Sequence, residues 1–171
     1  MTYKHVVNGE NFQFNQFLYN SFCDQPKSWV MRNYKVNHAD KSMSPGVQYY
    51  DQQSYLLKMS GQVVSGLTFN FNNKAEYQLE KMGFSIPGWE KQNSCEILHF
   101  FVMDVPRRNS FHIGKAILKL EKEILSKKHL QTIFATCAAR ILPIYCRFGW
   151  ELIDEITLEK NKKLFLIQYS H

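Results

Sequence analysis

The chain has 171 residues, close to the usual size of one domain, so we expect residues 1–171 to form a single domain. Hydrophobic residues make up 44% and aromatic residues 15% of the sequence, which excludes a disordered acidic tail or a low-complexity linker. A net charge of +6 favours phosphate-bearing or acidic partners. Because the basic residues are spread out and no nucleic-acid-binding motif is present, we expect a solvated basic surface and no nucleic-acid partner.

The cysteines and the first residues bear on the cellular setting. Four cysteines show neither metal-binding nor disulfide-framework spacing, so we expect buried free thiols and no metal. The first ten residues lack an apolar signal segment, and no stretch approaches about 18 apolar residues. We therefore expect a cytoplasmic protein without a membrane partner. The 13 phenylalanines leave room for an exposed apolar patch and a homodimer.

The N-terminal quarter is predicted to be helical and then irregular. Apolar residues at helical spacing across 14–22 predict a first helix that ends before Pro26. A second amphipathic stretch follows around Trp29 and Tyr34. The polar segment 37–46 is expected to be a loop.

The next segment is predicted to be a β-hairpin followed by an insertion. Residues 54–71 combine strand-forming residues with a Ser-Gly-Gln break, and Gly66 in the second strand indicates a bulge or a close approach. Residues 74–82 predict a short helix stopped by Gly83, and 84–93 reads as irregular. We expect this insertion to shape a substrate pocket.

A buried strand and a long helix form the centre of the predicted fold. Residues 95–103 are almost continuously apolar, as in a central strand. A polar loop, 107–110, precedes the strongest helical pattern in the chain. Its apolar residues lie at i, i+3, i+4, i+7 and i+11, namely Ile113, Ala116, Ile117, Leu120 and Ile124.

The C-terminal third continues the alternation of strands and helices. A strand is predicted over 131–137, a helix over 138–148 closed by Gly149, and two strands over 150–158 and 164–169. This order predicts an α/β (α+β) fold with a mixed, mostly antiparallel central sheet flanked by helices.

The turn between the central strand and the long helix is a candidate anion site. A helix N-terminus offers unpaired N–H groups and a positive dipole end to a phosphate. Arg107 and Arg108 add charge, Ser110 adds a hydroxyl, and Gly114 would allow close approach of a ligand. The alternative is an ordinary helix cap beside two solvated arginines.

The order of elements from about Ser54 onward resembles the GNAT acyltransferase family. The turn before the long helix in that family reads Gln/Arg-x-x-Gly-x-Gly/Ala, and its amides bind the pyrophosphate of coenzyme A. The matching stretch here runs from Asn109 to Gly114, and it departs from the pattern at Asn109 and His112. Arg108 lies where it would supply the missing cation. Tyr145, followed by Phe148-Gly149-Trp150, matches the family's later Tyr-x-x-x-Gly-Phe.

The resemblance implies a binding region for coenzyme A. In it the central strand splays from its neighbour and presents backbone groups to the thioester and pantetheine. His112 either bonds a phosphate or only fills a glycine position. The residues implied are Phe101, Val102, Met103, Arg107, Arg108, Asn109, Ser110, Phe111, His112, Ile113, Gly114 and Lys115.

Two residues are candidates for proton transfer. By its match to the family, Tyr145 would protonate the leaving thiolate; the alternative is a packed tyrosine at a helix end. Glu96 would accept a proton from the acceptor amine, and burial would raise its pKa; the alternative is a solvated strand-end glutamate. Strict alternation places His99 on the strand face opposite Glu96. No Cys-His or Ser-His-Asp arrangement is apparent.

Three functional hypotheses follow. The first is an acyl-CoA-dependent N-acyltransferase, with acetyl-CoA as the default donor and an amine of a small molecule or protein as the acceptor. The second rests on a fainter resemblance of Glu96-Ile97-Leu98-His99-Phe100 to the Glu-Leu-Ser-Arg-Phe of acyl-homoserine-lactone synthases, which implies an acyl-carrier-protein donor; here His99 replaces the arginine. The third is a non-catalytic protein of the same fold that binds acyl-CoA or a partner.

Overall fold

Seven strands form the sheet around which the protein is built. The computed structural model describes residues 2–6, 11–22, 34–45, 51–104, 106–158 and 161–170. The sheet order is β1-β4-β5-β6-β7-β9-β8, and only the β6–β7 pair is parallel among these neighbours. The predicted mixed, mostly antiparallel sheet is confirmed. Its strands are β1 (Thr2–His5), β4 (Gln52–Met59), β5 (Gln62–Asn70), β6 (Ser94–Val102), β7 (Thr132–Ala138), β8 (Glu151–Thr157) and β9 (Lys163–Ser170).

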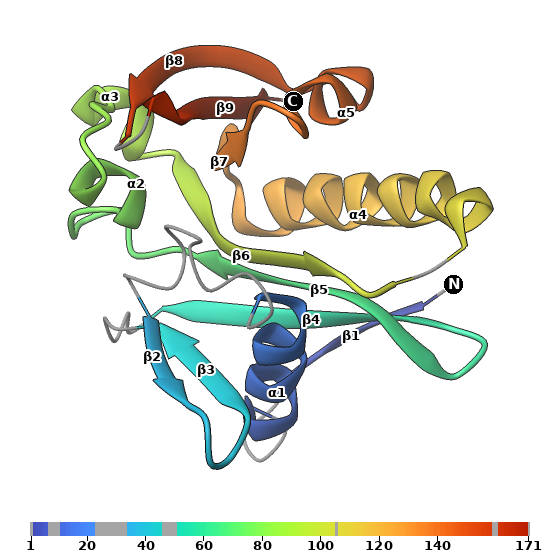
Figure 1. Ribbon diagram of the computed structural model, residues 1–171. Helices are drawn as coiled ribbons and strands as arrows, with labels where there is room; N and C mark the ends of the chain where they lie inside the picture. Colours follow the sequence, from blue (N-terminus) through green and yellow to red (C-terminus); the bar gives the residue numbers. More distant parts are fainter. Residues whose placement is uncertain are drawn as a thin grey trace.

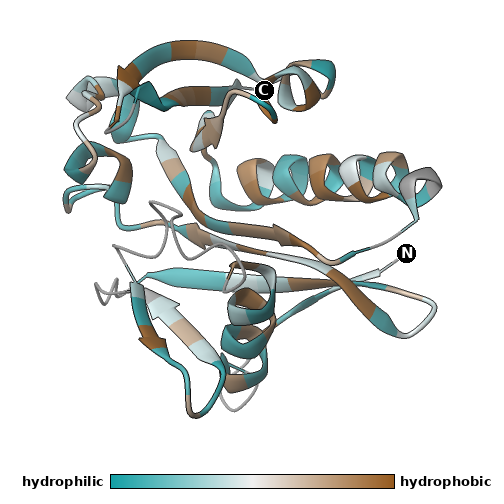
Figure 2. Cartoon of the chain, viewed as in Figure 1, coloured by the Kyte–Doolittle hydropathy of each residue, from teal (hydrophilic) through white to brown (hydrophobic). Residues whose placement is uncertain are grey.

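Helices cover both faces of this sheet (Figure 1). The long helix α4 (Arg107–Lys128) and the short α5 (Leu142–Arg147) pack on one face through a single apolar cluster. On the other face, α1 (Asn11–Phe22) and α2 (Gln78–Lys81) belong to two further clusters. The one-turn helix α3 (Gly88–Lys91) follows α2 in the insertion. In Figure 2 the most hydrophobic segments include β6 and stretches of α4, in agreement with the predicted buried strand and amphipathic helix.

Several predicted segments in the first half differ from the structure. The helix expected over 74–82 is confined to α2, and the segment 84–93, expected to be irregular, contains α3. The expected loop over 37–46 contains a strand, because β2 (Tyr34–Asn37) pairs with β3 (Ser42–Pro45) in a separate hairpin. The Asn37 side chain accepts hydrogen bonds from the amides of Ala39 and Asp40, so the polar residues form the turn and not a longer loop. Tyr34, expected in an amphipathic stretch with Trp29, begins β2; Trp29 lies outside the described residues.

The remaining differences concern where elements begin. The hairpin over 54–71 is confirmed, and its turn residues Ser60 and Gly61 both have positive φ, as a two-residue β-hairpin turn requires. Residues 107–110, expected as a loop, form the first turn of α4. The helix expected over 138–148 is confined to α5, which has a proline at its N-terminal end. The strand β1 was not predicted, because a four-residue, largely exposed edge strand carries little apolar pattern.

The sequence prediction of a close approach at Gly66 is confirmed. A Cβ atom added there would lie 2.5 Å from Cζ of Phe101 and 3.0 Å from an edge atom of Phe14. The missing side chain therefore lets the Phe101 ring lie against β5, where Phe14 of α1 contacts it edge-on with ring centroids 5.5 Å apart. The missing side chain of Gly66 therefore helps α1 to pack onto the sheet.

The substitution Gly66→Ala is expected to destabilise the protein by about 1–3 kcal/mol, the usual cost of overpacking a core. Gly88→Ala is the matched control, because nothing lies within 4 Å of a Cβ at that position. The free energy of unfolding, measured by urea denaturation, distinguishes the two variants. Equal stability of both would show that the Phe101 ring moves aside freely.

Candidate functional site

The two parallel strands at the middle of the sheet diverge. β6 and β7 pair only along Ser94–Glu96, after which β6 continues to Val102 alongside β5 alone (Figure 1). The amide of Met103 donates a hydrogen bond to the Val64 carbonyl at 2.9 Å, so the backbone groups of Met103 face β5. Because these groups alternate along a strand, those of Val102 and Phe100 face the open side. The predicted splay is present.

The three residues predicted to contact the donor, Phe101, Val102 and Met103, do not all face the open side of β6. The Phe101 carbonyl accepts a hydrogen bond from the Ser65 hydroxyl at 2.6 Å, and its ring is buried under α1. Like Met103, Phe101 thus directs its backbone toward β5. Val102 is 41% exposed and lies at the diverging end of β6. Of the three residues, only Val102 has backbone groups on the open side, and the sequence analysis missed Phe100, which shares that side.

The N-terminus of α4 lacks a side-chain cap. Its N-cap residue is Pro106, its first turn contains no acidic residue, and the Asn109 amide already donates to the Pro106 carbonyl at 2.8 Å. Helix geometry leaves the amides of Arg107 and Arg108 without intrahelical acceptors. These two amides, with the positive end of the helix dipole, form a place where an anion is stabilised.

The predicted cradle lies further into the helix than expected. Residues 111–114 are beyond the first turn of α4, so their amides are positioned to bond within the helix and not to a ligand. Ser110, Phe111, His112 and Lys115 are exposed, Asn109 is half-buried, and Ile113 belongs to the core. The Lys115 ammonium lies over the Phe111 ring, 4.6 Å from its centroid.

An aromatic ring occupies the space that the missing side chain of Gly114 leaves. A Cβ at Gly114 would lie within 3.0 Å of three atoms of the Phe148 ring. Phe148 ends α5 and also packs near Phe111, with ring centroids 6.1 Å apart. The glycine expected to admit a ligand therefore admits Phe148 in this structure.

Tyr145 lies next to the diverging part of β6. It belongs to α5, and its ring packs edge-on against Phe100 and Trp150, with centroids 6.3 and 5.3 Å apart. Burial, followed by the nearby charge of Glu121, raises the pKa of Tyr145 above its usual range. The hydroxyl therefore stays protonated at neutral pH, and in this free state it is a weaker acid than a solvated tyrosine.

Glu96 is buried and fully engaged. Its side chain is 1% exposed, so the alternative of a solvated strand-end glutamate is wrong. The carboxylate accepts hydrogen bonds from the Asn70 side chain at 2.8 Å and from the backbone amides of Gln78 and Leu79 at 2.9 and 3.3 Å. Burial raises the pKa of Glu96 to about 7, although these hydrogen bonds oppose the shift. Glu96 thus ties α2 to the central strand.

The predicted placement of His99 opposite Glu96 is wrong. On β5, Thr68 pairs with His99, whereas the next residue, Phe69, pairs with Ile97, so Leu98 is an extra residue in β6. Thr68 and Asn70 point to one face of β5, and their partners His99 and Glu96 therefore share a face of β6.

The two predicted catalytic residues do not meet on one face. Phe100, which contacts Tyr145, packs in the apolar cluster under α4 and α5. Glu96 bonds to α2, on the other face of the sheet. The structure places Tyr145 and Glu96 on opposite sides of β6.

A buried carboxyl on α4 escaped the sequence analysis. Glu121 is 2% exposed, burial raises its pKa to about 8, and a hydrogen bond with the Trp150 side chain opposes that shift. The spacing Ile117, Glu121, Leu125 places it on the buried stripe of the helix, and this was the available signal. Its proximity to Tyr145 makes it part of the electrostatic surroundings of the candidate acid.

Comparison with known proteins places this geometry in a known fold. No protein-family model matches the sequence, and no curated protein does. Among solved structures, MesI, a CoA-dependent acyl-homoserine lactone synthase, superposes with a TM-score of 0.71 at 14% identity, over 99% of this chain and 88% of that one. A GNAT-family protein from Desulfovibrio desulfuricans gives a TM-score of 0.61 at 8% identity, over 99% and 98% of the two chains. The chain has the GNAT fold.

A third structure with the GNAT fold differs in its substrate. A point mutant of the spermidine N-acetyltransferase SpeG from Vibrio cholerae gives a TM-score of 0.63 at 9% identity, covering 99% of this chain and 95% of that chain. At these identities the likeness concerns the fold alone. Among the helices that the structure describes, none is long and apolar enough to span a membrane.

The substitution Glu96→Gln is expected to change how stability depends on pH. A pKa raised from 4.5 to about 7 means that the folded state holds the Glu96 proton more tightly than the unfolded state. The stability that this tighter proton binding gives the folded state is therefore fully present below pH 4.5 and is lost as the pH rises through about 7. Between pH 4.5 and 8 the wild type should lose roughly 3 kcal/mol relative to Glu96→Gln.

The measurement is urea denaturation of both proteins across that range. Glu121 is present in both, so its own titration cancels from the difference. Parallel pH profiles would show that Glu96 titrates normally in the folded protein.

Proposed function

We propose that the protein is an acyltransferase that takes its acyl group from an acyl-CoA, by default acetyl-CoA, and transfers it to an amine. One observation carries this proposal: after leaving β7, β6 runs without that neighbour to Val102 and leads into an uncapped helix N-terminus that bears two arginines in its first turn. A thioester with a pantetheine arm has amides that match the unpaired backbone of β6, and its pyrophosphate matches the amides of Arg107 and Arg108. The supporting likeness to CoA-dependent MesI favours this donor over an acyl-carrier protein.

The residues of the chain have complementary roles in this proposal. Val102 and Phe100 would orient the thioester through their backbone groups, and Ser110 would contact a phosphate. The attacking amine forms a C–N bond with the thioester carbon, and the C–S bond breaks. Tyr145 gives its hydroxyl proton to the leaving sulfur, and Glu96 takes a proton from the amine, directly or through water.

The position of Glu96 constrains its part in this scheme. Its carboxylate faces the side of β6 opposite Tyr145, so acid and base would approach the reacting carbon from different sides. A pKa of about 7 leaves a substantial fraction ionised at neutral pH, which suits a general base. Its bonds to α2 give Glu96 a positioning role in addition.

A second candidate function is supported by the ring of Phe148. Because this ring fills the space at Gly114, the helix terminus has less room for a pyrophosphate than an open glycine turn would give. This observation favours a GNAT-fold protein that does not bind coenzyme A and serves as a partner-binding module. Titration with the coenzyme decides between the two functions.

Calorimetric titration with acetyl-CoA, a long-chain acyl-CoA and free coenzyme A is expected to give dissociation constants of about micromolar order for at least one of them. Ser110→Glu should weaken this binding at least about tenfold, because a carboxylate in the first turn repels the pyrophosphate while favouring the helix dipole. Ser110→Gln is the neutral control of the same size. Equal binding by both variants would remove the N-terminus of α4 from the donor site, and no binding by the wild type would favour the second candidate.

Tyr145→Phe is expected to lower the release of free thiol from the acyl-CoA by about 10²-fold in the presence of an amine panel, with unchanged coenzyme affinity. The phenylalanine keeps the ring contacts with Phe100 and Trp150, so the fold should be preserved. Stopped assays with a thiol reagent measure this rate. Unchanged turnover would assign Tyr145 to packing only.

A further inference from the structure

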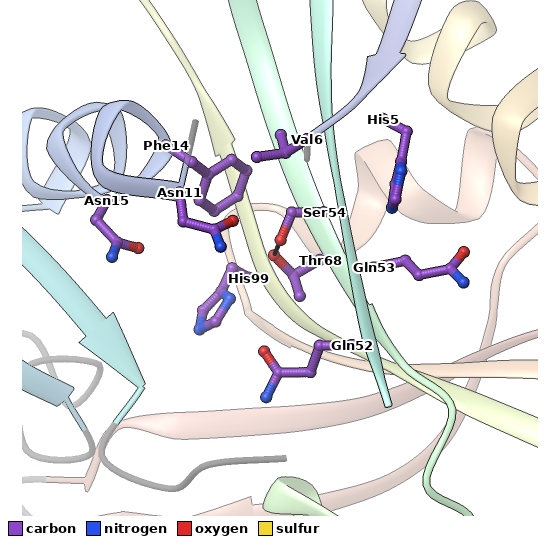
Figure 3. A pocket seen from close by; sticks show the side chains of 10 residues that line it. All are labelled: His5, Val6, Asn11, Phe14, Asn15, Gln52, Gln53, Ser54, Thr68 and His99. Atoms are coloured by element: carbon purple, nitrogen blue, oxygen red, sulfur yellow. Dashed lines mark hydrogen bonds between the residues drawn. The ribbon is translucent and has the colours of Figure 1, made fainter. Parts of the chain in front are cut away.

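The face of the sheet opposite α4 contains a pocket that the proposed donor site does not use. It has a volume of about 530 Å³, within the usual range for small-molecule sites. Figure 3 shows that β1, α1 and the strands β4, β5 and β6 all contribute to its lining. The side chains from α1 are Asn11, Phe14 and Asn15, and β6 contributes His99.

His99 is a buried polar group without a hydrogen-bond partner among the residues that the structure describes. Its side chain is 5% exposed, and neither ring nitrogen is bonded within that part of the chain. Its ring packs edge-on against Tyr34, with centroids 5.0 Å apart, a contact that satisfies neither nitrogen. Leaving such a group unpaired costs about 1–3 kcal/mol, and a ligand that reached the ring from the pocket and bonded to it would recover that cost.

The protonation state of His99 limits what that ligand is. Burial lowers the pKa of His99 to about 3, so the ring is neutral at physiological pH. A neutral imidazole offers one N–H donor and one nitrogen acceptor. The two nitrogens point in different directions, so one bonds to an acceptor and the other to a donor, and an uncharged ligand with amide groups offers both kinds of partner.

The rest of the lining is polar and carries few charges. The described residues around the pocket include two asparagines and two glutamines, and none of them is Asp, Glu, Lys or Arg. Ser54 and Thr68 satisfy each other through a hydrogen bond of 2.7 Å between their hydroxyls (Figure 3). Apart from the two imidazoles, of His5 and His99, the described walls offer a charged ligand no ionisable partner, whereas amide and hydroxyl groups match them.

We propose that this pocket binds the acyl acceptor through an uncharged carboxamide-like group, and that His99 is the residue that recognises it. The assignment as acceptor rests on the proposed acyltransfer; the pocket and its ligand class do not. The bulge at Leu98 gives His99 the same face of β6 as Glu96, the proposed base, so an amine attached to the recognised group lies on the side where its proton is removed.

Three compounds of nearly the same shape test the ligand class. Propanamide ends in a neutral amide, propanoate in a carboxylate and propylammonium in an ammonium group, and none of them carries a second amide. The ring nitrogens of His99 in ¹⁵N-labelled protein report binding by long-range ¹H–¹⁵N correlation. The neutral amide is expected to shift them saturably, and the two charged compounds should bind at least about tenfold more weakly. Equal or tighter binding of a charged compound, or no shift with any compound, would overturn the proposal.

His99→Phe provides a test that needs no ligand for its first result. Removing an unpaired buried polar group while keeping the aromatic contact with Tyr34 should raise the unfolding temperature by about 2–4 °C. The same variant should lose propanamide binding, followed through the amide resonances of Ser54 and Thr68. His99→Gln, which keeps one donor and one acceptor, should retain part of the binding. A lower unfolding temperature for His99→Phe would show that the ring is already bonded in the folded protein, contrary to the proposal.

Failure of this inference and failure of the proposed function are distinguishable. The three probes are titrated without any acyl donor, and the donors are titrated without any probe. Amide binding without acyl-CoA binding would overturn the acceptor assignment. Acyl-CoA binding without amide binding would overturn the pocket proposal and leave the acyltransferase proposal intact.

Discussion

The early end of pairing between β6 and β7 is the constraint on which the rest of the structure depends. A central strand that loses one neighbour must have its free backbone groups solvated or bonded by something else. In this protein α5 brings Tyr145 against the Phe100 side chain at that place, and α4 begins close to where β6 ends. The candidate donor site is thus formed by β6, α4 and α5, which come together where β6 runs without β7 as a neighbour.

A single inserted residue controls the opposite face. Without the extra Leu98, His99 would point toward α4 and the apolar cluster beneath it, and the pocket on the α1 face would lose its unpaired imidazole. The bulge therefore places both titratable residues of β6, Glu96 and His99, on one side, while Ile97 and Phe100 pack on the side of α4. Gly66 lies two residues before Thr68 on β5 and shapes the same face, because its missing side chain admits the Phe101 ring beneath α1.

How much could be predicted from the sequence depended on the range of the interaction. The amphipathic stripe of α4, the apolar run of β6 and the turn at Ser60 and Gly61 are local patterns, and each predicted its element. The bulge at Leu98 depends on pairing with β5, which lies far earlier in the chain, so alternation alone gave the wrong face for His99. The start of α4 was missed because Arg107 to Ser110 are polar, and polarity does not separate a first helical turn from a loop.

The position of Phe148 has a consequence for the order of events when a ligand approaches. Any group that enters the space above Gly114 must first displace this ring, and the Phe148 amide is bonded to the Tyr145 carbonyl at 2.9 Å. Rotation about the side-chain bonds moves the ring while this backbone hydrogen bond stays in place. A ligand at that place therefore gives up part of its binding free energy to separate the Phe148 ring from Gly114, and its apparent affinity falls by that amount.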